Sequence, residues 1–334
     1  MLKHILVAFI FITSLASHGE VNKDHEAADL GTFKPHWSKL PFLAKEVHER
    51  GYELPLPIGF SFVYNFQEVD YQAKEDFHVK ARGGVLGCMG LSGVARAACL
   101  LNGNPNKEST SYDVPFSDVS IEGEDKSFQL RADVWVLPFL NLFLVAGATD
   151  GTKQINAKLN NVSGLGGICS ALSAIGRDCV LPIPLEYEAT NFGGGLVLAG
   201  QVDPFTWTEP IVLTAMGMAT NAWTDMLDST ILMTVAQLKV GQRFTIFENK
   251  LTYLVGYNYQ FLKQDVSGRL SLVGTGLENI MEEVDFGVDI ENIESHNFAI
   301  SLNYDFGDKD QWNIFTEYGF LNWKQWIFQF GRRF

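Results

Sequence analysis

Aromatic and aliphatic residues alternate one by one with polar or small residues along five segments of the chain. Most of the segments keep this period of two for about nine to eleven residues, the length with which a tilted β-strand crosses a bilayer. The segments are 60–67, 127–136, 252–261, 297–306 and 312–318.

The alternation gives each segment two faces, because successive side chains of a β-strand point to opposite sides of a sheet. Aromatic residues stand near segment ends, as in the interfacial girdles of membrane proteins; these are Phe60, Phe66, Phe261, Phe306 and Trp312. After the first 20 residues no apolar run reaches the ~18 residues that a spanning helix needs. The pattern therefore predicts an all-β fold, a closed antiparallel transmembrane β-barrel.

Two kinds of connection join the predicted strands. Pro138–Asn141 and Gly307–Asp310 are short, whereas 102–116, 161–180 and 263–282 are long and polar or rich in glycine. Short turns at one end and long loops at the other are typical of outer-membrane barrels. Weaker strands are expected at 76–83, 117–124, 152–160, 183–201 and 206–247. The total is about twelve strands, with ten to fourteen compatible, since bacterial barrels favour even numbers.

The composition changes the picture in one respect. Hydrophobic residues make up 46% of the 334 residues and aromatic residues 13%, whereas only 19% are charged. Soluble domains have about 25% charged residues. Part of the molecular surface is therefore expected to face something other than water.

The N-terminal region differs from the rest. Residues 1–19 have the apolar core, Ile5–Leu15, and the small residues of a cleaved signal peptide. Residues 20–56 show no alternation, and within them Leu43–Arg50 favours a short helix. We expect a periplasmic leader or partial plug at 20–56 and the barrel at 57–334.

Four cysteines form two close pairs, Cys88 with Cys99 and Cys169 with Cys179. In an exported chain they favour disulfides, although four cysteines allow three connectivities. Metal binding is not expected, because the spacing is not CxxC and no histidine is near. The surrounding segments are mostly apolar, so they are expected either to cover the barrel mouth as a lid or hydrophobic ligand pocket, or to pack on themselves.

The C-terminal segment, Lys324–Phe334, resembles the last strand of Gram-negative outer-membrane β-barrel proteins. Trp326, Phe328, Phe330 and Phe334 share one face, although Arg332 stands where that class usually has an apolar residue. The resemblance implies that these residues form the signal for the barrel-assembly machinery. Residues 129–141 and 192–200 further resemble a proteobacterial barrel group of unassigned function, which supports the fold and implies no activity.

Charged residues on the polar strand faces are the candidates for a functional lumen. Arg131 and Asp133 lie two apart and share one face, and Asp305, Glu317 and Lys324 are candidate partners on other strands. Unpaired buried charges are costly, so such residues must pair or be hydrated. They form either a charge ladder at a constriction or an ion network that fills a narrow bore.

No pattern predicts a cofactor or catalysis. Nucleophilic catalysis needs a base beside the nucleophile, and beyond residue 55 the histidines are His78 and His296, with no serine suitably placed on the same strand face. We expect a passive channel or transporter for a small hydrophobic or cationic solute. The alternatives are a non-conducting structural, adhesion or surface-interaction barrel and, third, a lipid-modifying enzyme.

The expected partners follow from the predicted location, the bacterial outer membrane. They are outer-membrane lipid and lipopolysaccharide, the barrel-assembly machinery and a small-molecule solute. Nucleic acid is excluded, because the net charge is -14 and phosphate binding requires positive charge.

Overall fold

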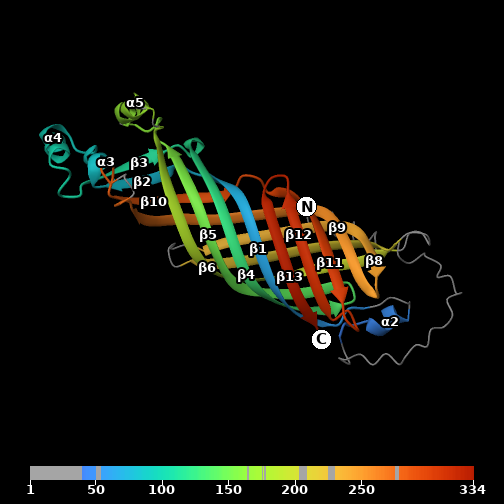
Figure 1. Ribbon diagram of the computed structural model, residues 1–334. Helices are drawn as coiled ribbons and strands as arrows, with labels where there is room; N and C mark the ends of the chain where they lie inside the picture. The colour runs from blue at the N-terminus through green and yellow to red at the C-terminus, as the bar shows by residue number, and fades with distance from the viewer. Residues whose placement is uncertain are drawn as a thin grey trace.

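A computed structural model describes residues 40–49, 54–163, 165–174, 176, 178–202, 209–224, 230–274 and 278–334. The predicted signal peptide and residues 20–39 of the predicted leader lie outside this range. The described strands form one antiparallel sheet of thirteen strands (Figure 1).

The strands differ widely in length. They are β1 (Ile58–Ala73), β2 (Phe77–Arg82), β3 (Ser109–Val114), β4 (Val119–Leu137), β5 (Leu140–Lys158), β6 (Val180–Val202), β7 (Ile211–Thr224), β8 (Thr230–Ile246), β9 (Asn249–Ser271), β10 (Glu283–Asn292), β11 (His296–Phe306), β12 (Trp312–Phe320) and β13 (Lys324–Arg333).

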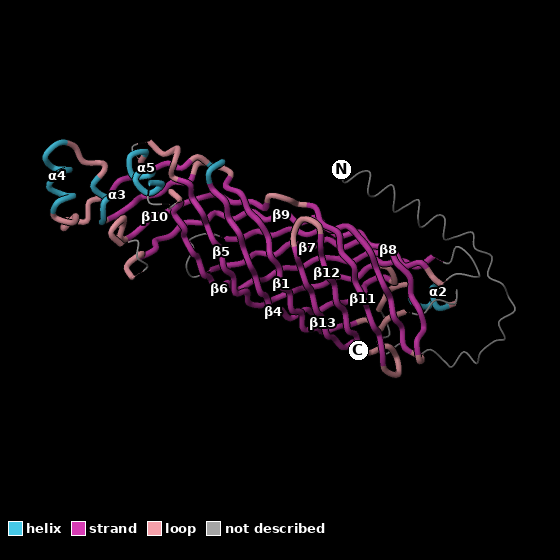
Figure 2. The backbone as a smooth tube through the Cα atoms, turned by 45° about the horizontal axis from the view of Figure 1, so that its top comes forward, coloured by secondary structure: helices cyan, strands magenta, loops and turns pink. Residues whose placement is uncertain are grey.

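The sheet closes on itself. In the described residues the ring runs β1–β4–β5–β6–β7–β8–β9–β11–β12–β13 and returns to β1. The closing pair β1–β13 is in register from Gly59↔Arg333 to Glu68↔Lys324. Figure 2 shows the resulting tube of tilted strands. The predicted closed barrel is confirmed.

The wall has ten strands, at the lower limit of the predicted range rather than about twelve. Residues 117–124 and 152–160, predicted as separate strands, are instead parts of β4 and β5. These two strands have 19 residues each, and β6 and β9 have 23. About nine to eleven residues cross a bilayer, so the longer strands continue beyond it.

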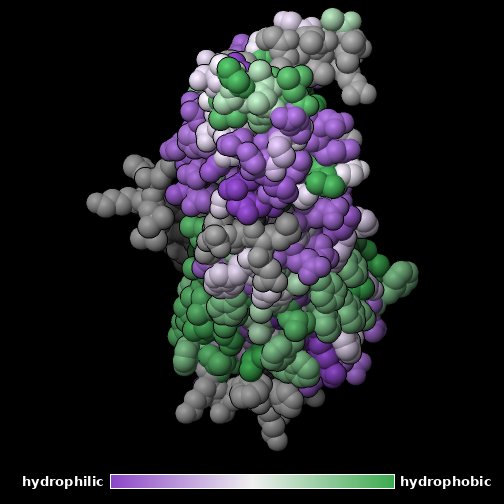
Figure 3. Space-filling model, turned by 90° about the vertical axis from the view of Figure 1, so that its left-hand side faces the viewer, coloured by the Kyte–Doolittle hydropathy of each residue, from purple (hydrophilic) through white to green (hydrophobic). Residues whose placement is uncertain are grey.

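An apolar belt surrounds the half of the barrel that includes the C-terminus. Its exposed side chains include Phe60, Phe62, Phe128, Leu130, Leu142, Leu144, Phe192, Leu196, Leu238, Val240, Val255, Phe298, Ile300, Leu302, Trp326 and Phe328. Figure 3 shows a hydrophobic band on one part of the surface and a hydrophilic region beyond it. So much outward apolar surface is stable only against hydrocarbon, which places the belt in a membrane.

Beyond the belt, the polarity of the two faces is reversed. The long strands continue and, joined by β2, β3 and β10, form an extension with polar outer faces and an apolar core. The core residues include Val69, Tyr71, Ile121, Ile155, Ile183, Leu185, Val266, Val284, Phe286 and Ile290. The extension is thus packed like a soluble protein, whereas the belt is not.

Short helices stand at the tip of the extension (Figure 1). They are α3 (Gly84–Cys88), α4 (Gly93–Leu101) and α5 (Gly166–Ala174), and a 3-10 turn, η2 (Phe116–Asp118), precedes β4. The predicted disulfides are present as Cys88–Cys99 and Cys169–Cys179.

The tip helices differ in their packing. Leu86 of α3 and Cys169 of α5 belong to the apolar core of the extension, so these two helices cap that core. On α4, Val94 is 86% and Leu101 is 85% exposed, so this helix stands free at the tip, contrary to the predicted lid.

The opposite end of the barrel carries the short turns at 138–139, 247–248 and 307–311. The predicted leader helix is present there as α2 (Ala44–His48), and the nearby Phe42 amide donates a 2.9 Å hydrogen bond to the carbonyl of Val136. No helix in the described part of the chain is long and apolar enough to cross a membrane.

Candidate functional site in the barrel interior

The interior of the barrel is lined by polar side chains, several of them nearly inaccessible to solvent. They include Ser61, Gln67, Asp125, Asp133, Asn141, Lys153, Lys239, Asn258, Gln260, Gln264, Ser301 and Glu317. Buried polar groups of this kind need partners, and the structure provides most of them in three networks. Within the described residues Gln67 Oε1, Asn258 Oδ1 and Gln264 Nε2 have none.

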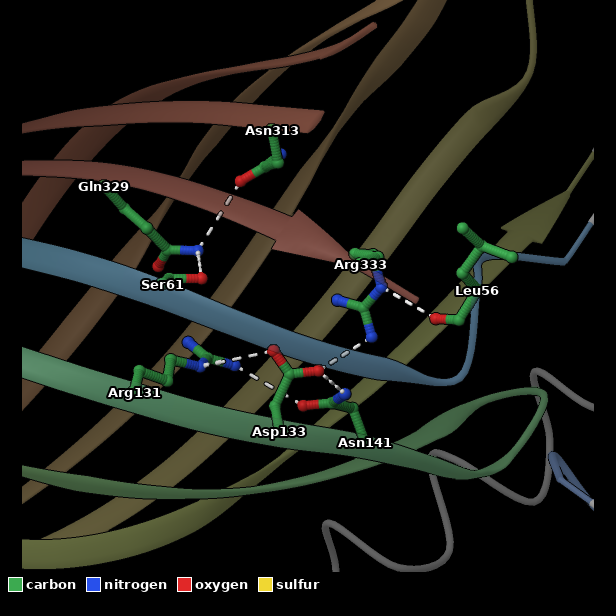
Figure 4. Close-up of polar contacts among 8 residues, drawn as sticks. All are labelled: Leu56, Ser61, Arg131, Asp133, Asn141, Asn313, Gln329 and Arg333. Atoms are coloured by element: carbon green, nitrogen blue, oxygen red, sulfur yellow. Dashed lines mark hydrogen bonds and ion pairs between the residues drawn. The ribbon is translucent and has the colours of Figure 1, made fainter. Parts of the chain in front are cut away.

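The first network lies near the C-terminus and joins Arg131 to Asp133, as the sequence suggests (Figure 4). The Asp133 carboxylate accepts hydrogen bonds of 2.7 Å from Arg333 Nη2 and from Asn141 Nδ2. Arg131 lies 4.1 Å above the ring of Phe143. Two guanidinium groups thus flank one carboxylate, held by strands β4, β5 and β13.

The second network is centred on Glu317 of β12, which is 1% exposed. Its carboxylate accepts hydrogen bonds from Ser301 Oγ at 3.0 Å and Asn258 Nδ2 at 2.9 Å, and it pairs with the ammonium group of Lys239. Lys239 lies on β8, and β9 and β11 separate β8 from β12 in the ring. This ion pair therefore spans part of the bore.

Gly256 makes room for that lysine. A Cβ atom at this position would overlap the Lys239 side chain, which lies directly opposite on β8. The Lys239 side chain can therefore take the position in which it pairs with Glu317 only because residue 256 has no side chain.

The third network lies where the extension begins and is centred on Lys153 of β5, which is 2% exposed. Its ammonium group donates 3.0 Å hydrogen bonds to Tyr187 Oη and to Gln264 Oε1. β6, β7 and β8 separate β5 from β9, the strand of Gln264, so this contact crosses the bore.

The nearby Asp125 carboxylate completes the third network. It accepts hydrogen bonds from the hydroxyls of Tyr187 and Tyr71, the latter at 3.3 Å. Burial, with the charge of Asp125 adding to it, raises the pKa of both tyrosines well above the usual value. Burial also lowers the pKa of Lys153, and attraction to Asp125 opposes that change.

The other lumen candidates are placed differently. Asp305 faces the interior and accepts 2.8 Å hydrogen bonds from Asn303 and Asn313. Lys324 lies on the outer face instead, where its side chain is 67% exposed and forms a 2.8 Å ion pair with Glu68. It has the same parity along β13 as the outward Trp326 and Phe328, so it belongs to the outside of the wall.

Sequence reasoning did not identify Lys239, Lys153, Asn141 and Arg333. Lys239 continues the polar face of an alternating strand, between the outward Leu238 and Val240, and this signal was available in the sequence. The partners across the bore lie on distant strands, which no local pattern reveals.

The histidines lie apart from these networks. His78 Nδ1 is 2.6 Å from Asp113 Oδ1 on the exposed face of the extension, and His296 contacts the Tyr257 hydroxyl outside the wall. Within the described ranges, no group of three His, Cys, Asp or Glu side chains could hold a metal ion.

No protein-family model and no curated protein sequence matches this chain. Among solved structures, the beta domain of the Bordetella autotransporter Brka is 11% identical with a TM-score of 0.34, covering 83% of this chain and 98% of that one. The Ralstonia pickettii toluene transporter TbuX is 11% identical with a TM-score of 0.30, covering 84% and 90%. The translocator domain of NalP from Neisseria meningitidis is 9% identical with a TM-score of 0.27, covering 87% and 93%. At these values the likeness says nothing of what this chain binds or carries.

Proposed function

We propose that this outer-membrane barrel does not conduct solutes along its axis and acts at the cell surface through its extension. The observation that supports the proposal best is the contact between Lys153 and Gln264, which joins opposite walls beneath the apolar core of the extension. Short turns face the periplasm in barrels of this class, so the extension projects outward.

The energetics favour a closed bore. An ion on the axis would have to displace Lys153 from its hydrogen bond with Gln264 and then cross the apolar core of the extension. An ion in an apolar core meets a large desolvation penalty.

A passive channel for a small hydrophobic solute is the second candidate, and it stays a prediction. The observation in its favour is the accessible space on the inner face of β7 within the belt. There the side chains of Met216 and Met218 are only half-buried. A solute such as toluene, for which the transporter TbuX is named, would need a route from this space past the third network.

Planar-bilayer recordings of the purified full chain separate the two candidates. We expect no unitary conductance in about 1 M KCl, a concentration that suppresses surface charge effects. We also expect no swelling of liposomes in solutions of small sugars. The double variant Lys153→Ala/Gln264→Ala leaves the apolar core of the extension in place, so we expect it to stay closed, as does Lys158→Ala, an exposed lysine on the same strand. Steady conductance of the unaltered protein would reject the closed bore.

A further inference from the structure

A groove of about 860 Å³ lies on the outer surface of the extension, next to the rim of the apolar belt. One wall is the hairpin that joins β12 to β13, with Tyr318, Phe320 and Leu321 exposed. The other wall is the outward face of β1, β4, β5 and β6. Its carboxylates are Glu68, Asp70, Glu122, Glu124 and Glu186.

Like charges stand directly opposite each other in this wall. The register of β1 and β4 places Glu68 against Glu124 and Asp70 against Glu122. Like charges in directly opposed positions destabilise a sheet. Two consecutive pairs on one face therefore carry an electrostatic cost that the fold itself does not require.

Local cations offset only part of that cost. Lys324 pairs with Glu68 at 2.8 Å and Lys126 pairs with Glu124 at 2.6 Å. For the side chains of Asp70, Glu122 and Glu186, no hydrogen bond or ion pair occurs within the described structure. The groove thus has an excess of negative charge beside an exposed aromatic wall.

We propose that this groove is the docking site for an extended basic peptide segment of a partner protein, one in which arginine or lysine alternates with apolar side chains. The inference deepens the proposed surface function and rests on it. Basic side chains would relieve the repulsion between Asp70 and Glu122, and apolar side chains would cover Phe320 and Leu321. Aromatic faces also attract cations directly, and the volume is in the usual range for ligand sites of about 300–1,000 Å³.

The chemistry favours an organic cation over a bound metal ion. A metal site needs several oxygen ligands converging at about 2.3–2.6 Å, and no group of three acidic side chains in the described residues converges in that way. A strand-like peptide can instead place successive cations along the two rows of carboxylates, since its own side chains alternate in the same manner.

The test uses the full chain in nanodiscs of phosphatidylcholine, which adds no net lipid charge. A fluorescein-labelled peptide of alternating arginine and leucine is titrated, and binding is followed by anisotropy. We expect the double variant Asp70→Asn/Glu122→Gln to weaken binding about tenfold or more and to reduce its salt dependence. Phe320→Ala is expected to weaken binding about threefold or more without changing the salt dependence.

The matched control is Glu75→Gln/Glu283→Gln, which removes the same charge from the extension outside the groove. Equal weakening by this control would mean general attraction to an acidic surface and would overturn the site. If calcium chloride displaced the peptide at constant ionic strength, the groove would be a site for a metal ion and the peptide proposal would be overturned. Conductance of the same purified protein is measured in planar bilayers. A conducting barrel that still binds peptide at the groove refutes the closed bore alone, and a closed barrel that binds none refutes the groove alone.

Discussion

Lys153 on β5 donates a 3.0 Å hydrogen bond to Gln264 on β9, although three strands separate β5 from β9 in the wall of the barrel. The contact marks the level at which the polar interior of the belt gives way to the apolar core of the extension. Tyr71 and Tyr187 lie beside the ammonium group, 5.2 and 4.3 Å from their ring centres. A single lysine therefore ties opposite walls together where the bore ends.

Replacing Lys153 with alanine is expected to destabilise the barrel. The variant leaves Asp125 buried without its nearby cation and Gln264 without a donor, which costs about 2–4 kcal/mol. The free energy of unfolding in guanidinium chloride, measured in detergent micelles, checks this. Lys158→Ala on the outer face of the same strand is the control and should change it by less than about 0.5 kcal/mol. Equal stability of the two variants would mean that the third network contributes nothing.

Gly151 is expected to tolerate no side chain, because the ring of Tyr187 lies directly over it. The two residues are paired in the register of β5 and β6, and a Cβ atom on Gly151 would overlap the ring. Gly151→Ala should therefore cost about 1–3 kcal/mol through overpacking and should disturb the tyrosine signals in near-ultraviolet circular dichroism. Gly200→Ala on β6 meets open space and should be neutral; a neutral Gly151→Ala would show that Tyr187 can move aside.

The closed barrel could be predicted from the sequence, but the extension could not. Alternation reveals that two faces differ, and it does not say which face is inside. On β4 the apolar residue Ile121 points inward above the belt, whereas Phe128 and Leu130 point outward within it. The apolar residues of β4 thus stand at an inward, odd position at 121 and at outward, even positions at 128 and 130. This change is the local sign that one strand passes from water into lipid.

The interior networks could be predicted only in part, for a related reason. Arg131 and Asp133 are two apart on one strand, so local spacing suffices to pair them. The partners Lys239 and Glu317 come together only through the register and closure of the ring. The prediction that Lys324 faces the lumen was wrong. Lys324 lies two residues before Trp326 on the same strand, so the two side chains share the outer face.

The carboxyl of Asp289 gives the extension a stability that depends on pH. A hydrogen bond with the side chain of Asp265, directly opposite on β9, together with burial and repulsion from Asp265, raises the pKa of Asp289 above its usual value of 3.8. The folded state thus binds this proton more tightly than the unfolded state. Its contribution is present below the usual value and is lost as the pH rises through the raised pKa.

Asp289→Asn should therefore stabilise the protein at pH 7, by about 0.2–1 kcal/mol through removal of opposed like charges. At a pH below the usual value Asp289 is protonated and as neutral as the asparagine, so the two proteins should unfold at the same denaturant concentration. Unfolding midpoints at several pH values between about 3 and 7 check this. An asparagine variant that is less stable at pH 7 would mean that Asp289 is held mainly by attraction.

Leu144 tests whether the apolar belt faces lipid. It lies on the outer face of β5, 57% exposed, where Leu144→Arg should cost about 2–4 kcal/mol if that position is near the bilayer midplane. The measurement is guanidinium unfolding of protein folded into lipid vesicles. Thr152→Arg, on the same face of the same strand but beyond the belt, should cost less than about 1 kcal/mol. On a surface in water, arginine in place of an exposed leucine would cost little stability, so equal stability of the two variants would mean that no bilayer surrounds the belt.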